Sequence, residues 1–145
     1  MINNKIPENL DAIYPVGEKH PDHVRTHNGH MLGDLTLDNL LTGNVAASDF
    51  RITAEGLRLQ AEVAEKAGRS NLAQNLRRGA ELVEIPDTVL LEFYELLRPG
   101  RAQNADKLRA AANQLRDTYG AKETASLIEE AALVYERRGV FQRRF

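Results

Sequence analysis

The sequence predicts an all-α fold, a small multi-helix domain of about five main helices preceded by an extended, irregular N-terminal arm. Two observations lead to this prediction. Beyond residue 50, apolar residues recur at helical spacing, and residues that start and stop helices bound each of these stretches. Over residues 12–33, glycines and prolines are too frequent for a regular element, and the chain shows no strand pair with a hairpin turn. We therefore expect an arm over residues 1–35 and a helical domain over residues 36–145.

Three central helices are expected between residues 51 and 101. The first follows Thr53, whose hydroxyl can cap a helix, and ends at Gly68, which adopts the left-handed conformation without a Cβ clash. Ser70 is expected to cap the second. Pro86 and Asp87 open the third, since proline fits a first helical turn and an acidic residue favours its positive end. The apolar faces are Leu57, Ala61 and Ala64 in the first helix, Leu72, Leu76, Ala80 and Val83 in the second, and Leu90, Phe93 and Leu97 in the third.

Helices are also expected before and after this central stretch. Residues 36–41 form a short one, capped by Thr36. A longer one runs from about Ala105 to Tyr119 and ends at Gly120, and the last runs from about Lys122 to Arg138. Their apolar faces are Leu37, Leu40 and Leu41 in the short helix, then Leu108, Ala112, Leu115 and Tyr119, then Ala125, Ile128, Ala132 and Tyr135.

Two glycines fall inside predicted helices. Gly56 and Gly79 each cost about 1 kcal/mol relative to alanine in a helix interior. Close approach of a neighbouring helix would explain them, and a tolerated local weakness is the alternative. The sequence leaves both explanations open.

Composition excludes several classes of protein. No run approaches the roughly 20 apolar residues of a membrane span, and no secretory signal is recognisable. Without cysteine there is neither a disulfide nor a thiolate site, which fits a cytoplasmic protein. The formal net charge of −2 gives no reason to expect nucleic acid as a partner.

The arm contains four histidines, at positions 20, 23, 27 and 30. Offsets of three, four and three residues would place His20, His23, His27 and His30 on one helical face, a spacing suited to imidazole metal ligands. However, a proline and an Asn-Gly pair among them argue against a continuous helix. We therefore expect solvated histidines rather than a metal site.

No catalytic constellation is recognisable. The chain pairs no nucleophile with a base and has no glycine-rich phosphate loop after a strand. Carboxylates of the central helices alternate with arginines off the apolar faces, so we expect solvated side chains rather than a general acid and base. These carboxylates are Glu62, Glu65, Glu81, Glu84, Glu92 and Glu95.

Short motifs in a fixed order point to a known family. They are Tyr14-Pro15, KHP at 19–21, TLDNLL at 36–41, RIT at 51–53, LRLQA at 57–61, AGR at 67–69, LAQN at 72–75, AEL at 80–82, IPD at 85–87, LRP at 97–99 with Arg101, and EEAALVYERR at 129–138. Over most of its length the chain resembles the small (gamma) subunit of the adenosylcobalamin-dependent diol and glycerol dehydratases. No single motif is diagnostic, but their number and order make the resemblance specific.

The resemblance implies a non-catalytic subunit of a lyase that converts propane-1,2-diol or glycerol to an aldehyde and water by a radical mechanism. Adenosylcobalamin would lie between the large (alpha) and medium (beta) subunits, in a complex with two copies of each of three chains. This chain would pack on the large subunit and stabilise it, without catalytic or cofactor-binding residues of its own. The sequence does not decide which diol is preferred or whether the chain folds alone.

Six residues are expected at the partner interface. Tyr14, Phe50 and Tyr94 are candidate aromatic anchors, because few buried residues carry most of the energy of an interface. Arg51 follows Phe50, and for that pair the sequence favours packing within the chain over a contact with the partner. Arg98 and Arg101 can bind carboxylates bidentately, either within the chain or across an interface, and their place beside a Pro-Gly corner favours the interface. At position 100 the family usually has an aromatic residue, so glycine there implies a reduced contact.

Location and alternative functions complete the expectations. Larger family members carry an amphipathic N-terminal extension associated with bacterial microcompartments, and this chain begins too close to Tyr14-Pro15 to hold one. The resemblance still allows a location inside such a compartment. The alternative function is a free-standing helical adaptor, which neighbouring genes for large and medium subunits would argue against. A small helical enzyme acting alone is the weakest alternative, and activity of the single purified chain would favour it.

Overall fold

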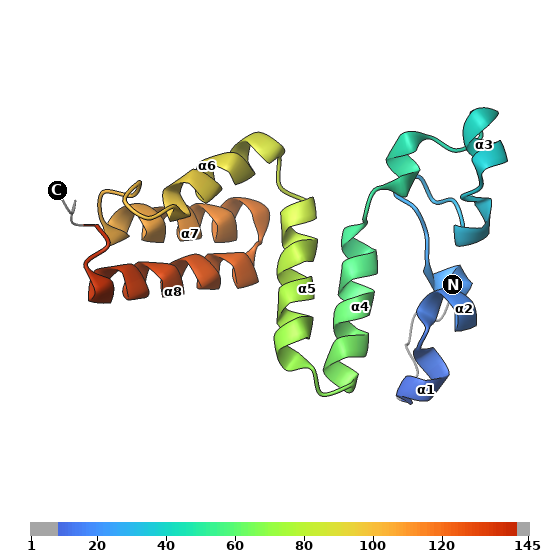
Figure 1. Ribbon diagram of the computed structural model, residues 1–145, viewed down its shortest axis with the longest axis horizontal. Helices are drawn as coiled ribbons and strands as arrows, with labels where there is room; N and C mark the ends of the chain where they lie inside the picture. Colours follow the sequence, from blue (N-terminus) through green and yellow to red (C-terminus); the bar gives the residue numbers. More distant parts are fainter. Residues whose placement is uncertain (1–8, 142–145) are drawn as a thin grey trace. The chain divides into compact units, whose positions relative to one another are not determined.

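The chain is helical in the computed structural model, which describes residues 9–141 (Figure 1). No strand occurs in that range, so the all-α prediction is confirmed, as are the five main helices and the irregular N-terminal stretch. The chain divides into two compact units, Met1–Ala80 and Glu81–Phe145, here called the N-terminal and C-terminal units. The division falls within the helix Ser70–Val83, labelled α5.

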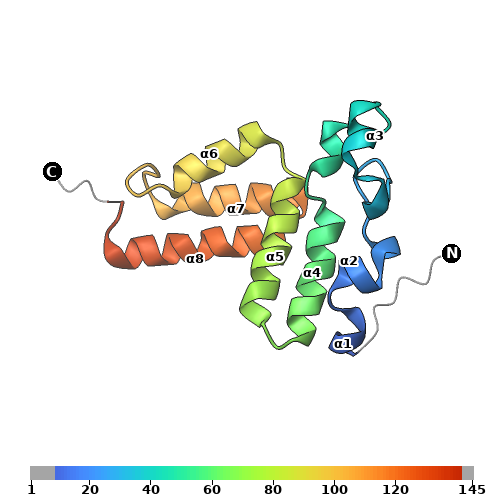
Figure 2. The ribbon, with the colours of Figure 1, turned by 45° about the vertical axis from the view of Figure 1, so that its right-hand side comes forward.

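The N-terminal unit is built on an antiparallel pair of helices. These are α4 (Ala54–Lys66) and α5 (Ser70–Val83), which lie side by side in both ribbon views (Figures 1 and 2). As predicted, the Thr53 hydroxyl caps α4 by accepting a bond from the Gly56 N–H at 3.0 Å. The turn between the helices contains Gly68 at φ +71°, which favours glycine.

The buried face of α5 differs from the predicted one. The prediction for α4 is confirmed, but on α5 the residues Leu72 and Val83 are exposed, while Ala73 and Ala80 are buried. Small side chains on both helices face each other in two clusters, with Leu76 packed against both. Because alanines allow close approach of two helices, the buried face of α5 is centred on them rather than on its larger aliphatic residues.

Ser70 does not cap α5, contrary to prediction. It is the first helical residue, and its hydroxyl donates a hydrogen bond to the Glu65 carboxylate at 2.9 Å. This bond, followed by the contact with Arg77, lowers the pKa of Glu65 below its usual value. Ser70 therefore acts in the connection between α4 and α5.

The two helix glycines have distinct surroundings. A Cβ on Gly79 would lie 3.4 Å from Leu57 Cδ1, an ordinary van der Waals contact between α5 and α4. A Cβ on Gly56 would lie 2.9 Å from Thr53 Oγ1, closer than real Cβ atoms approach. Gly56 therefore accommodates the cap of α4, whereas Gly79 leaves room for alanine.

Short elements occupy the chain before α4. They are α1 (Leu10–Ile13), α2 (Val16–Lys19), η1 (Pro21–His23), η2 (Leu32–Asp34), α3 (Leu37–Leu41) and η3 (Ala47–Phe50). The buried side chain of Ile13 anchors the first of them, and α1 contacts α4. The predicted helix at 36–41 is α3, whose cap, Thr36, accepts a bond from the Asn39 N–H at 3.2 Å. Its apolar residues Leu37 and Leu41 are exposed.

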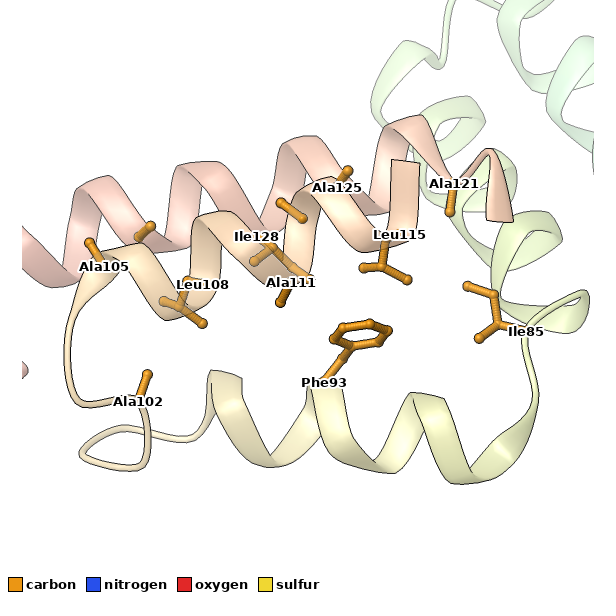
Figure 3. Close-up of a cluster of buried hydrophobic side chains, with 12 residues drawn as sticks. Ile85, Phe93, Ala102, Ala105, Leu108, Ala111, Leu115, Ala121, Ala125 and Ile128 are labelled. Carbon is orange, nitrogen blue, oxygen red and sulfur yellow. The ribbon is translucent and has the colours of Figure 1, made fainter. Parts of the chain in front are cut away.

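The C-terminal unit is a three-helix bundle of α6 (Asp87–Leu97), α7 (Ala105–Tyr119) and α8 (Lys122–Arg138). Figure 3 shows Phe93 pointing from α6 into the core, toward α7 and α8. The apolar faces predicted for α7 and α8 pack there, with several alanines. The buried cluster is Ile85, Phe93, Ala102, Ala105, Leu108, Ala111, Ala112, Leu115, Ala121, Ala125, Ile128 and Ala132.

Polar contacts at the surface of the bundle connect α8 to α6 and α7. The Tyr135 hydroxyl donates to the Leu97 carbonyl oxygen at 2.6 Å and so ties α8 to the end of α6. Arg109 pairs with Glu136, and Arg116 with Glu129, each at 2.8 Å between α7 and α8. Arginines and glutamates of the two longest helices therefore pair within the unit.

Glu81 stabilises the start of α8. Its carboxylate accepts bonds from the N–H groups of Glu123 and Thr124, at 2.9 and 2.8 Å, and from the Thr124 hydroxyl at 2.7 Å. A helix N-terminus leaves N–H groups without intrahelical partners, and the N-cap residue Ala121 has no side-chain acceptor. Glu81 supplies the missing acceptor, so the expectation of a solvated side chain was wrong.

We predict that Glu81→Gln destabilises the protein by about 1–3 kcal/mol, because hydrogen bonds to a charged acceptor contribute about twice as much as neutral ones. Urea denaturation of the full chain, followed by circular dichroism, measures the difference. Glu92→Gln, an exposed change on α6, is the control. Equal midpoints for the two variants would contradict a capping role for Glu81.

We predict that Gly79→Ala raises the free energy of unfolding by up to about 1 kcal/mol, since it removes a helix-interior glycine without a clash. Gly56→Ala should gain less or lose stability, because its Cβ displaces the Thr53 cap, and losing such a cap costs about 0.5–2 kcal/mol. Thermal unfolding of both variants beside the wild type measures the order. A lower midpoint for Gly79→Ala than for Gly56→Ala would refute this account.

Candidate subunit interface

The six residues predicted to contact a partner are distributed over both compact units. Tyr14, Phe50 and Arg51 belong to the N-terminal unit, whereas Tyr94, Arg98 and Arg101 belong to the C-terminal unit. The three aromatic side chains are exposed, by 64% for Tyr14, 52% for Phe50 and 66% for Tyr94. Exposed aromatic residues of this size are typical of interaction surfaces when they stand beside other apolar side chains.

In the C-terminal unit the candidates gather at the end of α6. The Glu95 carboxylate accepts from Arg98 at 3.0 Å and from Arg101 Nε at 2.8 Å, so one acidic side chain holds both arginines. Tyr94 and Leu91 are exposed on the same helix, and Leu91 would have been found by helical spacing from Tyr94. A shallow hollow of about 580 Å³ is lined by Leu91, Glu92, Glu95, Leu96 and Arg101. An apolar patch beside a cluster of paired charges is the kind of surface to which another protein can bind.

In the N-terminal unit, Phe50 and Arg51 begin a run of three consecutive exposed residues. The third is Ile52, which is 59% exposed and is not among the six predicted residues. The run lies between the buried residues Asp49 and Ala54. The run therefore begins with the last residue of η3 and ends just before the cap of α4, and its three side chains are exposed.

Asp49 connects the arm to this run. Its buried carboxylate accepts from the Thr26 hydroxyl at 2.6 Å and from the Ala46 N–H at 2.9 Å. The Thr26 bond is the main cause that lowers the pKa of Asp49 from 3.8 to about 2; the Ala46 N–H, Asn28 and His30 add to it, and burial opposes it. The ionised side chain therefore holds residues 24–31 against the segment that precedes α4.

A groove of about 1340 Å³ also opens in the N-terminal unit. The arm forms one wall and α4 with α5 the other. Its apolar lining includes Tyr14, Val16, Val24, Leu59, Val63 and Leu72, and its charged lining is Asp22, Arg25, Glu55 and Arg69.

The four histidines do not lie on one helical face. His20 follows α2 and its Nε2 lies 2.8 Å from the Ala12 carbonyl oxygen, while its ring meets His23 edge-on at 5.7 Å. His27 lines the groove, and His30 lies beside the Thr26 loop. Within residues 9–141, no three His, Cys, Asp or Glu side chains come together in a way that could hold a metal ion.

In the described part of the chain, no helix has both the length and the apolar character needed to cross a bilayer.

We predict that the Asp49 contact is lost in acid. Because the folded-state pKa lies below the ordinary value of 3.8, the ionised carboxylate stabilises the fold above about pH 4, and this contribution disappears as the pH falls through about 2. An NMR titration of the Asp49 carboxyl carbon measures the midpoint. The stability difference between wild type and Asp49→Asn should shrink over the same range. A midpoint near 4 would contradict the Thr26 contact.

Comparison with known proteins adds independent information. A protein family described as the dehydratase small subunit matches residues 10–142. The chain is 48% identical over 125 residues to the propanediol dehydratase small subunit of Citrobacter freundii. The aligned region covers 86% of this chain and 72% of that relative. It is 46% identical over 125 residues to the propanediol dehydratase small subunit of Salmonella typhimurium, with the same two coverages. The matched region includes all six predicted interface residues.

Proposed function

Because this chain belongs to the dehydratase small-subunit family, we propose that it is the small subunit of an adenosylcobalamin-dependent propanediol or glycerol dehydratase. The resemblance inferred from short sequence motifs is thereby confirmed. The chain contributes to a lyase without being its catalytic part, and its partners are other subunits of the same enzyme. The identity of 48% to a propanediol dehydratase small subunit is the observation that carries the proposal.

The division of labour among the subunits is part of the proposal. The large and medium subunits, in two copies each with two copies of this chain, hold the cofactor and the diol. Their radical chemistry removes water and leaves an aldehyde, and no residue of the small subunit is assigned to that reaction or to the cofactor. The complex is located in the cytoplasm, and packaging within a bacterial microcompartment is compatible with this role.

The small subunit acts by covering and stabilising the large one. We propose that residues 1–35 form an arm along the partner and that residues 36–145 form the helical domain. Tyr14, Phe50 and Tyr94 are the aromatic anchors of this contact, because aromatic side chains dominate interface energetics. Arg51, Arg98 and Arg101 supply its positive charge.

Co-expression tests the proposal. The tagged chain is produced with large and medium dehydratase subunits, and diol-dependent aldehyde formation is assayed with added adenosylcobalamin. We expect a stoichiometric three-chain complex whose activity or half-life falls when this chain is omitted. A folded chain that fails to join matched subunits would instead favour the adaptor function.

We predict that the double charge reversal Arg98→Glu/Arg101→Glu weakens assembly, because it places negative charge at the α6 corner and leaves Glu95 without its partners. The recovery of the other subunits with the tagged chain measures the effect. Lys107→Glu/Lys122→Glu, at exposed first-turn positions of α7 and α8, changes the net charge equally and is the control. Equal recovery of the other subunits with both double variants would show that Arg98 and Arg101 do not contribute to the interface.

A further inference from the structure

We propose that Phe50, Arg51 and Ile52 form the binding hot spot of the N-terminal unit, and that Arg51 binds a carboxylate on the large subunit. This inference rests on the proposed function, since it assumes that the large subunit is the partner. It assigns a specific chemistry to the partner surface, an apolar patch that contains an acidic side chain. It also adds Ile52 to the residues that make the contact.

The charge of Arg51 lacks an acidic partner within the chain. Its backbone N–H bonds to the Ser48 carbonyl oxygen, but no ion pair or side-chain hydrogen bond joins its guanidinium to another of residues 9–141. By contrast, Arg98 and Arg101 share Glu95, and other arginines pair between helices. Arg51 is therefore available for a carboxylate that comes from outside.

The two neighbours of Arg51 determine what kind of surface this carboxylate belongs to. Phe50 and Ile52, the residues before and after Arg51 in the chain, are 52% and 59% exposed, so a partner that covers the whole run buries apolar area next to a charged residue. Covering them would also remove water from Arg51, and desolvating an unpaired charge is costly. A partner surface that covers all three residues is therefore expected to present an anionic group to Arg51.

The run is held in a defined conformation before any partner binds. On one side, Asp49 is fixed by the Thr26 hydroxyl and the Ala46 N–H. On the other, Thr53 caps α4 through the Gly56 N–H. Arg51 itself is extended, with φ −75° and ψ 146°. Since both ends are anchored, little backbone entropy remains to be lost on binding, which favours affinity.

A competition experiment in the full complex tests this proposal. Tagged variants are co-expressed with the untagged wild-type chain and the large and medium subunits, and the tagged fraction of the purified complex is measured. Phe50→Ala, Arg51→Gln and Ile52→Ala should each lower incorporation by roughly 30-fold or more, the size that defines a hot spot. Arg51→Lys should retain part of the binding, because it keeps the charge but loses the bidentate geometry.

Arg137→Gln is the matched control, since Arg137 is exposed on α8 and has no ion pair in the described part of the chain. It should be incorporated like the wild type. Raising the salt concentration should weaken binding of the wild type more than that of Arg51→Gln, because salt screens the attraction between Arg51 and the partner carboxylate, which the variant lacks. Thermal unfolding of each free chain checks that the variants fold, which is expected since these side chains are exposed.

The outcomes separate this inference from the proposed function. If the tagged wild type enters no complex, the proposed function fails and the inference fails with it. If the tagged wild type enters the complex and all three variants are incorporated to the same extent, the inference alone is wrong. If Phe50→Ala and Ile52→Ala are excluded while Arg51→Gln enters with an unchanged salt dependence, the proposed carboxylate is wrong.

Discussion

The carboxylate of Glu81 is the constraint on which the C-terminal unit depends. A helix as long as α8 begins with several N–H groups that need acceptors, and the residue before it is an alanine. Glu81 provides both carboxylate oxygens to these groups and to the Thr124 hydroxyl, at 2.7–2.9 Å. The start of α8 is thereby stabilised next to Ala121 and Ala125, which belong to the buried core shared with α7.

Many charged side chains form ion pairs within their own unit, so the exposed groups without such pairs are the better candidates for contact with a partner. Glu65, Glu95, Glu129 and Glu136 all pair with arginines of their own unit, so these charges stabilise the chain itself. The exposed aromatic residues and Arg51 have no such internal role. Surfaces of this kind are expected in a subunit whose contribution is contact with other chains, and they agree with the family to which the chain belongs.

The candidate interface could be predicted only in part. Tyr14, Phe50 and Tyr94 were selected because aromatic residues dominate interfaces, and the structure places all three at the surface. Ile52 was overlooked because it lies in a family motif next to a helix cap and carries no distinctive chemistry. The Thr26–Asp49 contact spans 23 residues, and no local pattern announces it. The shared partner of Arg98 and Arg101 was also missed, although Glu95 lies one helical turn before Arg98.

The sequence by itself determined α3 and the five main helices, the capping residues Thr36 and Thr53, the apolar faces of α7 and α8, and the family. Spacing and capping act within one or two turns, so they can be recognised locally. Only the tertiary structure decided which face of α5 is buried and what Glu81 does. The first depends on how closely alanines let α4 and α5 approach. The second is a contact of Glu81 with Glu123 and Thr124, which follow it by 42 and 43 positions in the chain, so it exists only once the chain has folded.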